Sequence, residues 1–334
     1  MKVLKIFFII LFLLILAGFA LFYTQFSAPQ KKFEEERFVV NLKSSEEQIV
    51  DNLKEKGFIK NKNAFNFILT IKGWHGKISE GAFLISKDMN VFQLAKKLIA
   101  GPYQKWVVIL PGKRKEQVAV ILQKALSWPF SLARSFINLA EEGYLYPDTY
   151  LIDTDADPRQ IIQKLRFNFN EKFDADLQKE LLKQNIRNDT ALKIASLIER
   201  ESGGVEDKPI IAGIIWNRLL KEMKLEIDAT VQYAIATEKF NSLIANDQLL
   251  ITDDFSFWPT LSAGIVRTID SPYNTYLIKA LPAGPICSPS IDSIRAVAFP
   301  AQTDAFYYLH SSDKKIHTAK TYKEHQENIV KYLQ

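Results

Sequence analysis

The first pattern along the chain is an uninterrupted apolar run over residues 6–23, preceded by Lys2 and Lys5. A run of this length is roughly long enough to cross a bilayer as a helix. A cleaved signal peptide is the alternative, because residues 18–20 form a small-x-small site, although the apolar run continues beyond that site. We therefore expect an uncleaved transmembrane anchor in residues 1–25, with both lysines on the cytoplasmic side.

After the anchor, short strand-like and helix-like segments alternate. Residues 26–37 are polar and charged, and we expect them to form a tether. Residues 38–101 contain short apolar segments, some with the spacing of strands and some with the spacing of helices. Ser44 with Glu47 matches a capping box that would open a helix. Residues 102–150 continue with a strand followed by a helix and form a connecting region. This mixture predicts an α+β fold.

Helical spacing dominates from residue 151 to the C-terminus. The segment 188–202 has Asn188 or Asp189 as a possible N-cap, and Pro209 suits the first turn of the next helix. The pattern predicts a mostly helical α+β domain over 151–334.

Composition narrows the function classes. The 334 residues are 47% apolar and 24% charged, as in ordinary globular proteins, and the net charge is +5. This charge suits a protein near anionic polymers or membranes but is too small to indicate nucleic-acid binding. Cys287 is the single cysteine, which excludes an internal disulfide and a zinc site built on cysteines.

Glu199 and Glu201 stand two residues apart near the end of a predicted helix. Residues two apart point about 200° away from each other, so one cleft can receive only one of them. Glu201 shares its edge of the helix with Leu197 and Ile194, where partial burial would raise its pKa and suit a general acid. Ordinary surface charge at a frayed helix end is the alternative. Helical geometry favours Glu201 without deciding between the two.

Glycosidases usually have a second carboxylate from another segment, and Asp228, Asp253 and Asp254 are candidates. Metal binding is not expected, because the spacings of the histidines match no standard ligand motif. Residues 271–290 are rich in proline, tyrosine and asparagine, so their backbone is expected to be a loop. Such a loop suits carbohydrate binding, and a long structural turn is the alternative.

Six segments resemble motifs of the YceG-like family of endolytic murein transglycosylases. They are EGYLYPDTY (142–150), IASLIERESG (194–203), AGIIWNRL (212–219), LEIDATVQYA (225–234), the SPYNTY and LPAGPICSPS parts of 271–290, and FYYLHSSDKKIHTAKTYKEHQENI (306–329). Several positions depart from the family pattern, namely Glu226, Ala229, Ala283, Ser290 and Ala319.

The resemblance implies a small LysM-like α/β subdomain over 38–101 and a catalytic domain that follows it. It also implies that Glu201 is the catalytic acid, and Ser202 directly after it matches other lytic transglycosylases. Residues expected to position the substrate are Asp228, Tyr233, Tyr273, Asn274 and Asn217.

The implied reaction cleaves the MurNAc–GlcNAc β-1,4 bond within peptidoglycan strands and leaves 1,6-anhydroMurNAc ends, without a metal or organic cofactor. The implied partners are glycan strands, the cytoplasmic membrane and peptidoglycan synthases, with the catalytic domain on the outer side of that membrane and no nucleic acid. A non-catalytic peptidoglycan-binding protein and a lysozyme-type hydrolase are the alternatives.

Overall fold

The computed structural model of the chain contains both helices and strands, which confirms the predicted α+β class. It describes residues 2–245, 255–262 and 264–333. The chain forms two compact units: Met1–Val107 with Tyr150–Asp155, and Val108–Thr149 with Ala156–Gln334. The expected connecting region, 102–150, is divided between them, because its first strand pairs within the sheet of the first unit whereas its helices belong to the second.

The first unit begins with α1 (Lys2–Phe26), a helix of 25 residues. Its window Ile9–Phe26 has a mean hydropathy of 2.3, so α1 is long and apolar enough to cross a membrane. A signal sequence near an N-terminus has the same length and composition, so α1 fits the expected anchor without establishing it.

After α1, the first unit contains a four-stranded sheet, in the order β1-β2-β3-β4. β2 is antiparallel to both β1 and β3, and Phe38 pairs with Phe83. Gly81 starts β2 with a φ of +142°, and a Cβ there would lie 2.4 Å from the Gln104 carbonyl oxygen, so only glycine permits this close approach. The strands are β1 (Glu36–Val40), β2 (Gly81–Ile85), β3 (Gln104–Val108) and β4 (Thr149–Asp153).

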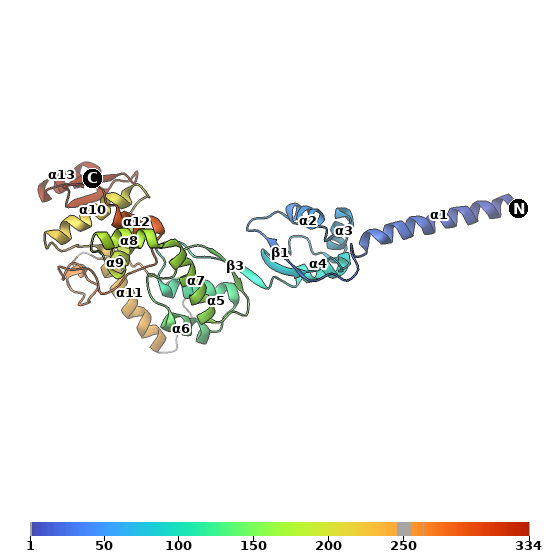
Figure 1. The fold of residues 1–334 in the computed structure, drawn as a ribbon, viewed down its shortest axis with the longest axis horizontal. Helices are drawn as coiled ribbons and strands as arrows, with labels where there is room; N and C mark the ends of the chain where they lie inside the picture. The colour runs from blue at the N-terminus through green and yellow to red at the C-terminus, as the bar shows by residue number, and fades with distance from the viewer. Residues whose placement is uncertain (1, 246–254, 263, 334) are drawn as a thin grey trace. The chain divides into compact units, whose positions relative to one another are not determined.

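Helices α2 (Glu46–Glu55), α3 (Lys62–Lys72) and α4 (Val91–Ile99) pack with this sheet around a buried apolar core (Figure 1). The capping box of α2 is formed by Ser45 and Gln48, one residue later than the expected Ser44 and Glu47. Both pairs have the required spacing, but Ser44 is held in the preceding turn, where its N–H donates to the Asn41 carbonyl. The LysM-like assignment of this unit stays a prediction.

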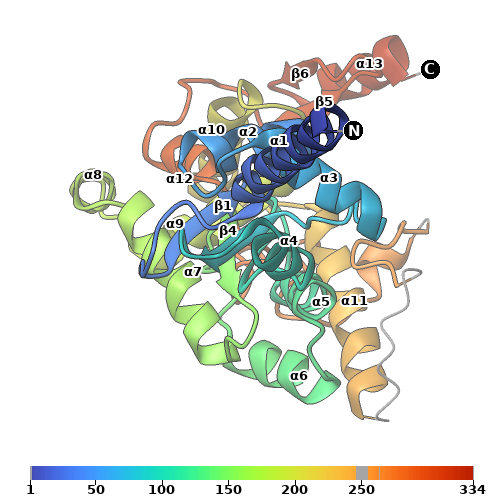
Figure 2. The same cartoon turned by 90° about the vertical axis from the view of Figure 1, so that its right-hand side faces the viewer.

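The second unit is mostly helical, as predicted, with one two-stranded sheet. Its helices are α5 (Lys115–Leu126), α6 (Phe130–Leu139), α7 (Pro158–Lys172), α8 (Ala175–Lys183), α9 (Asn188–Glu201), α10 (Asp207–Leu220), α11 (Asp228–Ala245), the 3-10 helix η1 (Ile265–Arg267), α12 (Ile291–Ala298) and α13 (Tyr322–Leu333). The strands β5 (Tyr307–His310) and β6 (Ile316–Ala319) form an antiparallel hairpin that packs beside α13 (Figure 2).

Helices α9, α10 and α12 pack against one another in the core of this unit (Figure 1). At Gly213, α10 lies close to the segment that follows α12, where a Cβ would be 2.4 Å from the Ala301 carbonyl oxygen. The N-cap position of α9 is Arg187, which makes no side-chain cap, so the expected cap at Asn188 or Asp189 is wrong. Residues 271–290 contain no helix or strand, which agrees with the expected loop.

Candidate active site

The last residue of α9 is Glu201, and the helix is fixed by its buried apolar face. Ser196 is fully buried, where it donates to the Lys193 carbonyl and accepts from the Ile286 N–H. The loop around residue 286 therefore covers the Ser196 side of the helix. α9 is held from several sides, which gives its C-terminal end a defined position.

The carboxyl of Glu201 is half-buried and has one hydrogen-bond donor, the Tyr308 hydroxyl, at 2.6 Å from Oε2. Burial raises the pKa of Glu201 above its ordinary value; the Tyr308 hydrogen bond opposes this rise, and the nearby charge of Asp228 adds to it. A carboxyl with a raised pKa keeps its proton nearer to neutral pH, as a general acid requires.

Glu201 opens into a cavity of about 700 Å³ in the second unit. This volume lies within the range of small-molecule and cofactor sites, roughly 300–1,000 Å³. The cavity combines acidic, basic and aromatic side chains. Its lining residues are Glu201, Arg218, Leu225, Glu226, Asp228, Arg267, Tyr276, Tyr307, Tyr308, Leu309, Tyr322, His325, Ile329 and Leu333.

Asp228 is the second predicted site residue in this cavity. It begins α11, and its Oδ1 accepts a hydrogen bond of 2.6 Å from the Tyr276 hydroxyl. Burial and the carboxylate of Asp228 raise the pKa of Tyr276, so this phenol stays a donor. Of the two other candidates for a second carboxylate, Asp253 and Asp254, both lie outside the described residues.

Glu199, two residues before Glu201, has an environment of the opposite kind. Its Oε2 accepts from Ser290 Oγ at 2.6 Å and Ser293 Oγ at 2.6 Å, and it lies 3.0 Å from Lys208 Nζ. Although burial alone would raise its pKa, these serine hydrogen bonds and Lys208 hold the pKa of Glu199 below its ordinary value. Glu199 is therefore a structural carboxylate that joins α9 to α10 and α12.

Two predicted amide residues hold the backbone together. Asn217 Nδ2 donates to the carbonyls of Thr303 (2.8 Å) and Ala305 (3.0 Å). Asn274 is fully buried, and its Nδ2 donates to the carbonyls of Val266 and Ile269, each at 2.8 Å. Both side chains lie outside the cavity lining, so the structure does not bring them together with Glu201.

The predicted tyrosines, Tyr233 and Tyr273, pack together with ring centroids 4.8 Å apart. They lie beside the fully buried Arg114, whose guanidinium carbon is 4.1 Å from the Tyr233 ring centre and which bonds to Glu116 at 3.1 Å. Burial, followed by the charge of Glu116, raises the pKa of the neighbouring Glu142 to about 8. We call these five residues the Arg114 cluster, and none of them lines the cavity.

Sequence reasoning missed Tyr308 and Tyr276, whose hydroxyls donate to Glu201 and Asp228. Tyr308 comes from β5, 107 residues away from Glu201, and no spacing rule connects them. His310, two positions further along β5, lies 3.0 Å from Asp207, which also accepts from the Gly203 N–H after α9. Side chains alternate along a strand, so Tyr308 and His310 lie on one face of β5. This alternation is the signal that could have indicated Tyr308 and His310 as site residues.

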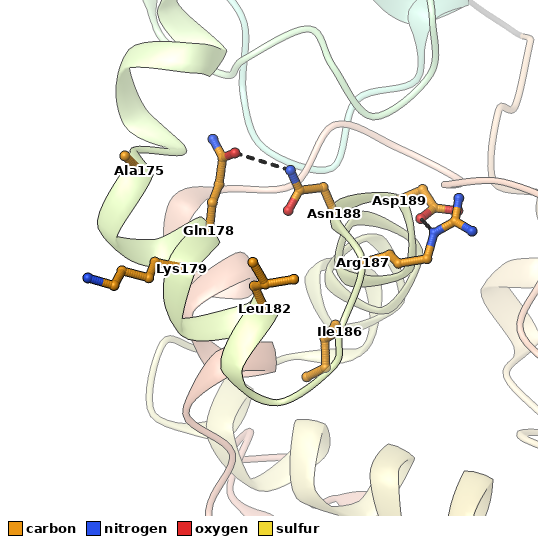
Figure 3. Close-up of a pocket in the computed structure, with 8 residues that line it drawn as sticks. All are labelled: Ala175, Gln178, Lys179, Leu182, Ile186, Arg187, Asn188 and Asp189. Atoms are coloured by element: carbon orange, nitrogen blue, oxygen red, sulfur yellow. Dashed lines mark hydrogen bonds and ion pairs between the residues drawn. The ribbon is translucent and has the colours of Figure 1, made fainter.

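In the described part of the chain, no group of three or more His, Cys, Asp or Glu residues could hold a metal ion. A second pocket, of about 670 Å³, lies between α8 and the start of α9 (Figure 3). Its lining includes Gln178, Leu182 and Arg187, without a buried carboxyl. The Glu201 cavity is the better candidate for chemistry.

Comparison with known proteins agrees with this choice. A model of the YceG-like family matches residues 38–331. An endolytic murein transglycosylase of Bacillus subtilis (strain 168) is 28% identical, over 96% of this chain and 91% of that protein. One from Streptococcus pneumoniae (strain D39) is 24% identical over 87% of this chain, which spans only 57% of that relative.

A crystal structure of a yceG-like protein from Listeria monocytogenes superposes with a TM-score of 0.56 at 26% identity, covering 88% of this chain and 98% of that one. The relatives and the solved structure both extend over almost the whole chain, and the family model includes the segments that carry Glu201, Asp228 and Tyr308. The chain therefore belongs to the YceG-like family.

Proposed function

We propose that this protein is an endolytic lytic transglycosylase that cleaves the MurNAc–GlcNAc β-1,4 bond within peptidoglycan strands. The observation that carries the proposal is Glu201, a half-buried carboxyl with a raised pKa in an open cavity, in a chain of this family. The names of the curated relatives support the same activity.

In the proposed mechanism, protonated Glu201 donates its proton to the glycosidic oxygen as the bond to C1 of MurNAc breaks. The resulting carboxylate then takes the proton of the MurNAc C6 hydroxyl, whose oxygen bonds to C1. The product is a 1,6-anhydro ring, and Glu201 is protonated again for the next turnover. One carboxyl acts first as acid and then as base, so no second nucleophilic carboxylate is required.

Two neighbouring groups assist this cycle. The negative charge of Asp228 favours the protonated form of Glu201 before the reaction. The Tyr308 hydroxyl stabilises the carboxylate that remains after proton transfer and fixes its orientation. We also propose that Asp228 positions the sugar, whereas Asn217 and Asn274 maintain the backbone around the site and Tyr233 and Tyr273 act through the Arg114 cluster.

We further propose that α1 remains attached as a single-pass anchor in the cytoplasmic membrane, with Lys2 and Lys5 inside and the residues after α1 outside. Residues 38–101 would then be a LysM-like subdomain between the anchor and the catalytic unit. An anchored enzyme of this kind would act on new strands close to the peptidoglycan synthases and terminate them.

Product analysis tests the proposed chemistry. The purified full chain is incubated with uncrosslinked glycan strands, and the ends are identified by mass spectrometry. We expect shorter strands with 1,6-anhydroMurNAc ends from the wild type and none from Glu201→Gln. Reducing ends in place of anhydro ends would identify a lysozyme-type hydrolase, and binding without shortening would identify a non-catalytic protein.

A further inference from the structure

The cavity that contains Glu201 has a second wall, contributed by β5 and α13. Tyr307, Tyr322, His325, Ile329 and Leu333 line it, and we call these five residues the α13 wall. Tyr307 directly precedes Tyr308 on β5, and neighbouring residues of a strand point to opposite faces. The strand therefore presents Tyr308 to Glu201 and Tyr307 to α13.

Aromatic rings dominate the α13 wall. The rings of Tyr307 and His325 are nearly parallel, at 23° with centroids 5.3 Å apart, and the Tyr322 ring lies 5.9 Å from Tyr307. The Tyr322 side chain is 59% exposed, so its ring is accessible from the solvent. Flat rings at the mouth of a cavity can pack against the apolar C–H face of a sugar while its hydroxyls remain solvated.

His325 adds an unpaired polar atom to this wall. Its Nδ1 is buried and has no hydrogen-bond partner among the residues that the structure describes. Burial and the charge of Arg218 lower the pKa of His325 and favour the neutral imidazole, which has one donor and one acceptor nitrogen. Buried polar atoms are nearly always paired, and a ligand hydroxyl or amide would supply the missing partner.

The cavity lining has two arginines, Arg218 and Arg267, and three carboxyl groups, so its charges do not select an anionic ligand. The adjacent Arg218 is already engaged, because its Nε donates to the Phe306 carbonyl and its Nη1 to the carbonyls of Lys224 and Leu225. Its guanidinium carbon also lies 5.0 Å from the Tyr307 ring centre. Arg218 thus has little capacity for a stem-peptide carboxylate, whereas the rings and the imidazole suit a sugar.

We infer that the α13 wall is a glycan subsite that binds a sugar ring of the strand other than the ring opened at Glu201. The sugar packs on Tyr322 and Tyr307, and one of its hydroxyl or acetamido groups bonds to His325. The inference rests on the proposed function, because it takes peptidoglycan as the substrate. It explains how an enzyme could grip a strand beyond the scissile bond and cleave within it.

Affinity measurements in the Glu201→Gln background test the subsite without turnover. The ligand is glycan strands stripped of stem peptides. We expect Tyr322→Ala to weaken binding about tenfold, because the substitution removes the apolar ring surface against which the sugar packs. His325→Phe keeps an aromatic ring but removes the nitrogens, and we expect a loss of about threefold. Tyr322→Phe should bind like the parent.

Gln326→Ala is the matched control, because Gln326 lies on the same helix, is exposed and does not line the cavity. Unchanged affinity in both Tyr322→Ala and His325→Phe would overturn the subsite. Losses seen with peptide-bearing strands but not with stripped strands would assign the wall to the stem peptide instead and also overturn it. An enzyme with active Glu201 that yields no anhydro ends refutes the proposed function, which is a separate result.

Discussion

Glu199 and Glu201 are two residues apart on the same helix, yet their carboxyls are held in opposite states. Glu199 accepts four hydrogen bonds, two from Ser290 (N–H and Oγ) and one each from Ser293 and Lys208, and its pKa is lowered. Among the residues that the structure describes, Glu201 has a single side-chain donor, Tyr308, and its pKa is raised by burial. Burial acts in the same direction on both carboxyls, and the larger number of donors at Glu199 reverses its effect there.

The largest expected effect separates the two glutamates by activity. We predict that Glu201→Gln lowers kcat on glycan strands by about 10³-fold, because amide nitrogen can neither donate the catalytic proton nor accept it back. Glu199→Gln in a folded sample should retain most of the activity. Rates of strand shortening measure both, and equal loss from the two substitutions would contradict the separation.

The second effect concerns stability, and here we expect Glu199→Gln to be more harmful than Glu201→Gln. Glu199→Gln leaves Lys208 without its counter-charge, and the side chains of the two residues are only 10% and 7% exposed. Removing one partner of a buried pair costs about 3 kcal/mol in the free energy of unfolding. Chemical denaturation of the second unit measures this cost.

Because its pKa is lowered in the folded state, the contribution of Glu199 to the free energy of unfolding depends on pH. The stabilisation is present above the pKa of an unfolded glutamate and is lost as the pH falls through the lower folded pKa. Glu199→Gln should therefore lose its disadvantage in acid. A deficit that stayed constant down to low pH would point to packing and not to charge.

Glu142 extends the comparison to a third carboxyl, in the Arg114 cluster. Its pKa of about 8 lies above the 4.5 of an ordinary glutamate, so the folded state holds this proton more tightly than the unfolded state. The free energy of unfolding should then fall by about 3 to 4 kcal/mol as the pH rises from about 5 to about 8. Glu142→Gln should flatten this slope, and an unchanged slope would assign it to another group.

The smallest effect is expected from Tyr308→Phe. Loss of this hydrogen bond, which stabilises the ionised form, should raise the pKa of Glu201 further. The limb where activity falls at high pH should move upward by as much as about one unit, and kcat should fall about fivefold. The pH profile of kcat measures both effects, with Tyr332→Phe on α13 as the control. A downward shift would mean that Tyr308 does not stabilise the carboxylate.

Much of the fold was predictable because local rules act within a few residues. The apolar run of residues 6–23 lies within α1, and the region after residue 151 is mostly helical, as its spacing predicted. The N-cap of α2 is Ser45 and not the expected Ser44, because Ser44 takes part in the preceding turn. Local signals fix elements but do not rank near-equivalent caps.

The site was predictable only in part. Helical geometry favoured Glu201 over Glu199, but the hydroxyl of Tyr308 arrives from a strand over a hundred residues later. Asn274 was expected at the substrate because amides in loops suit sugars, yet its amide group bonds to backbone carbonyls. Polar residues in a loop serve either purpose, and only tertiary contacts distinguish the two.

The bond between Glu201 and Tyr308 also orders events in time. α9 is synthesised well before β5, and the Tyr308 donor and the α13 wall lie in the final 28 residues of a 334-residue chain. A nascent chain that contains only the elements before β5 therefore has the Glu201 carboxyl without its Tyr308 donor. The environment that sets the pKa of Glu201 is complete only after β5 has been synthesised and has folded beside α9.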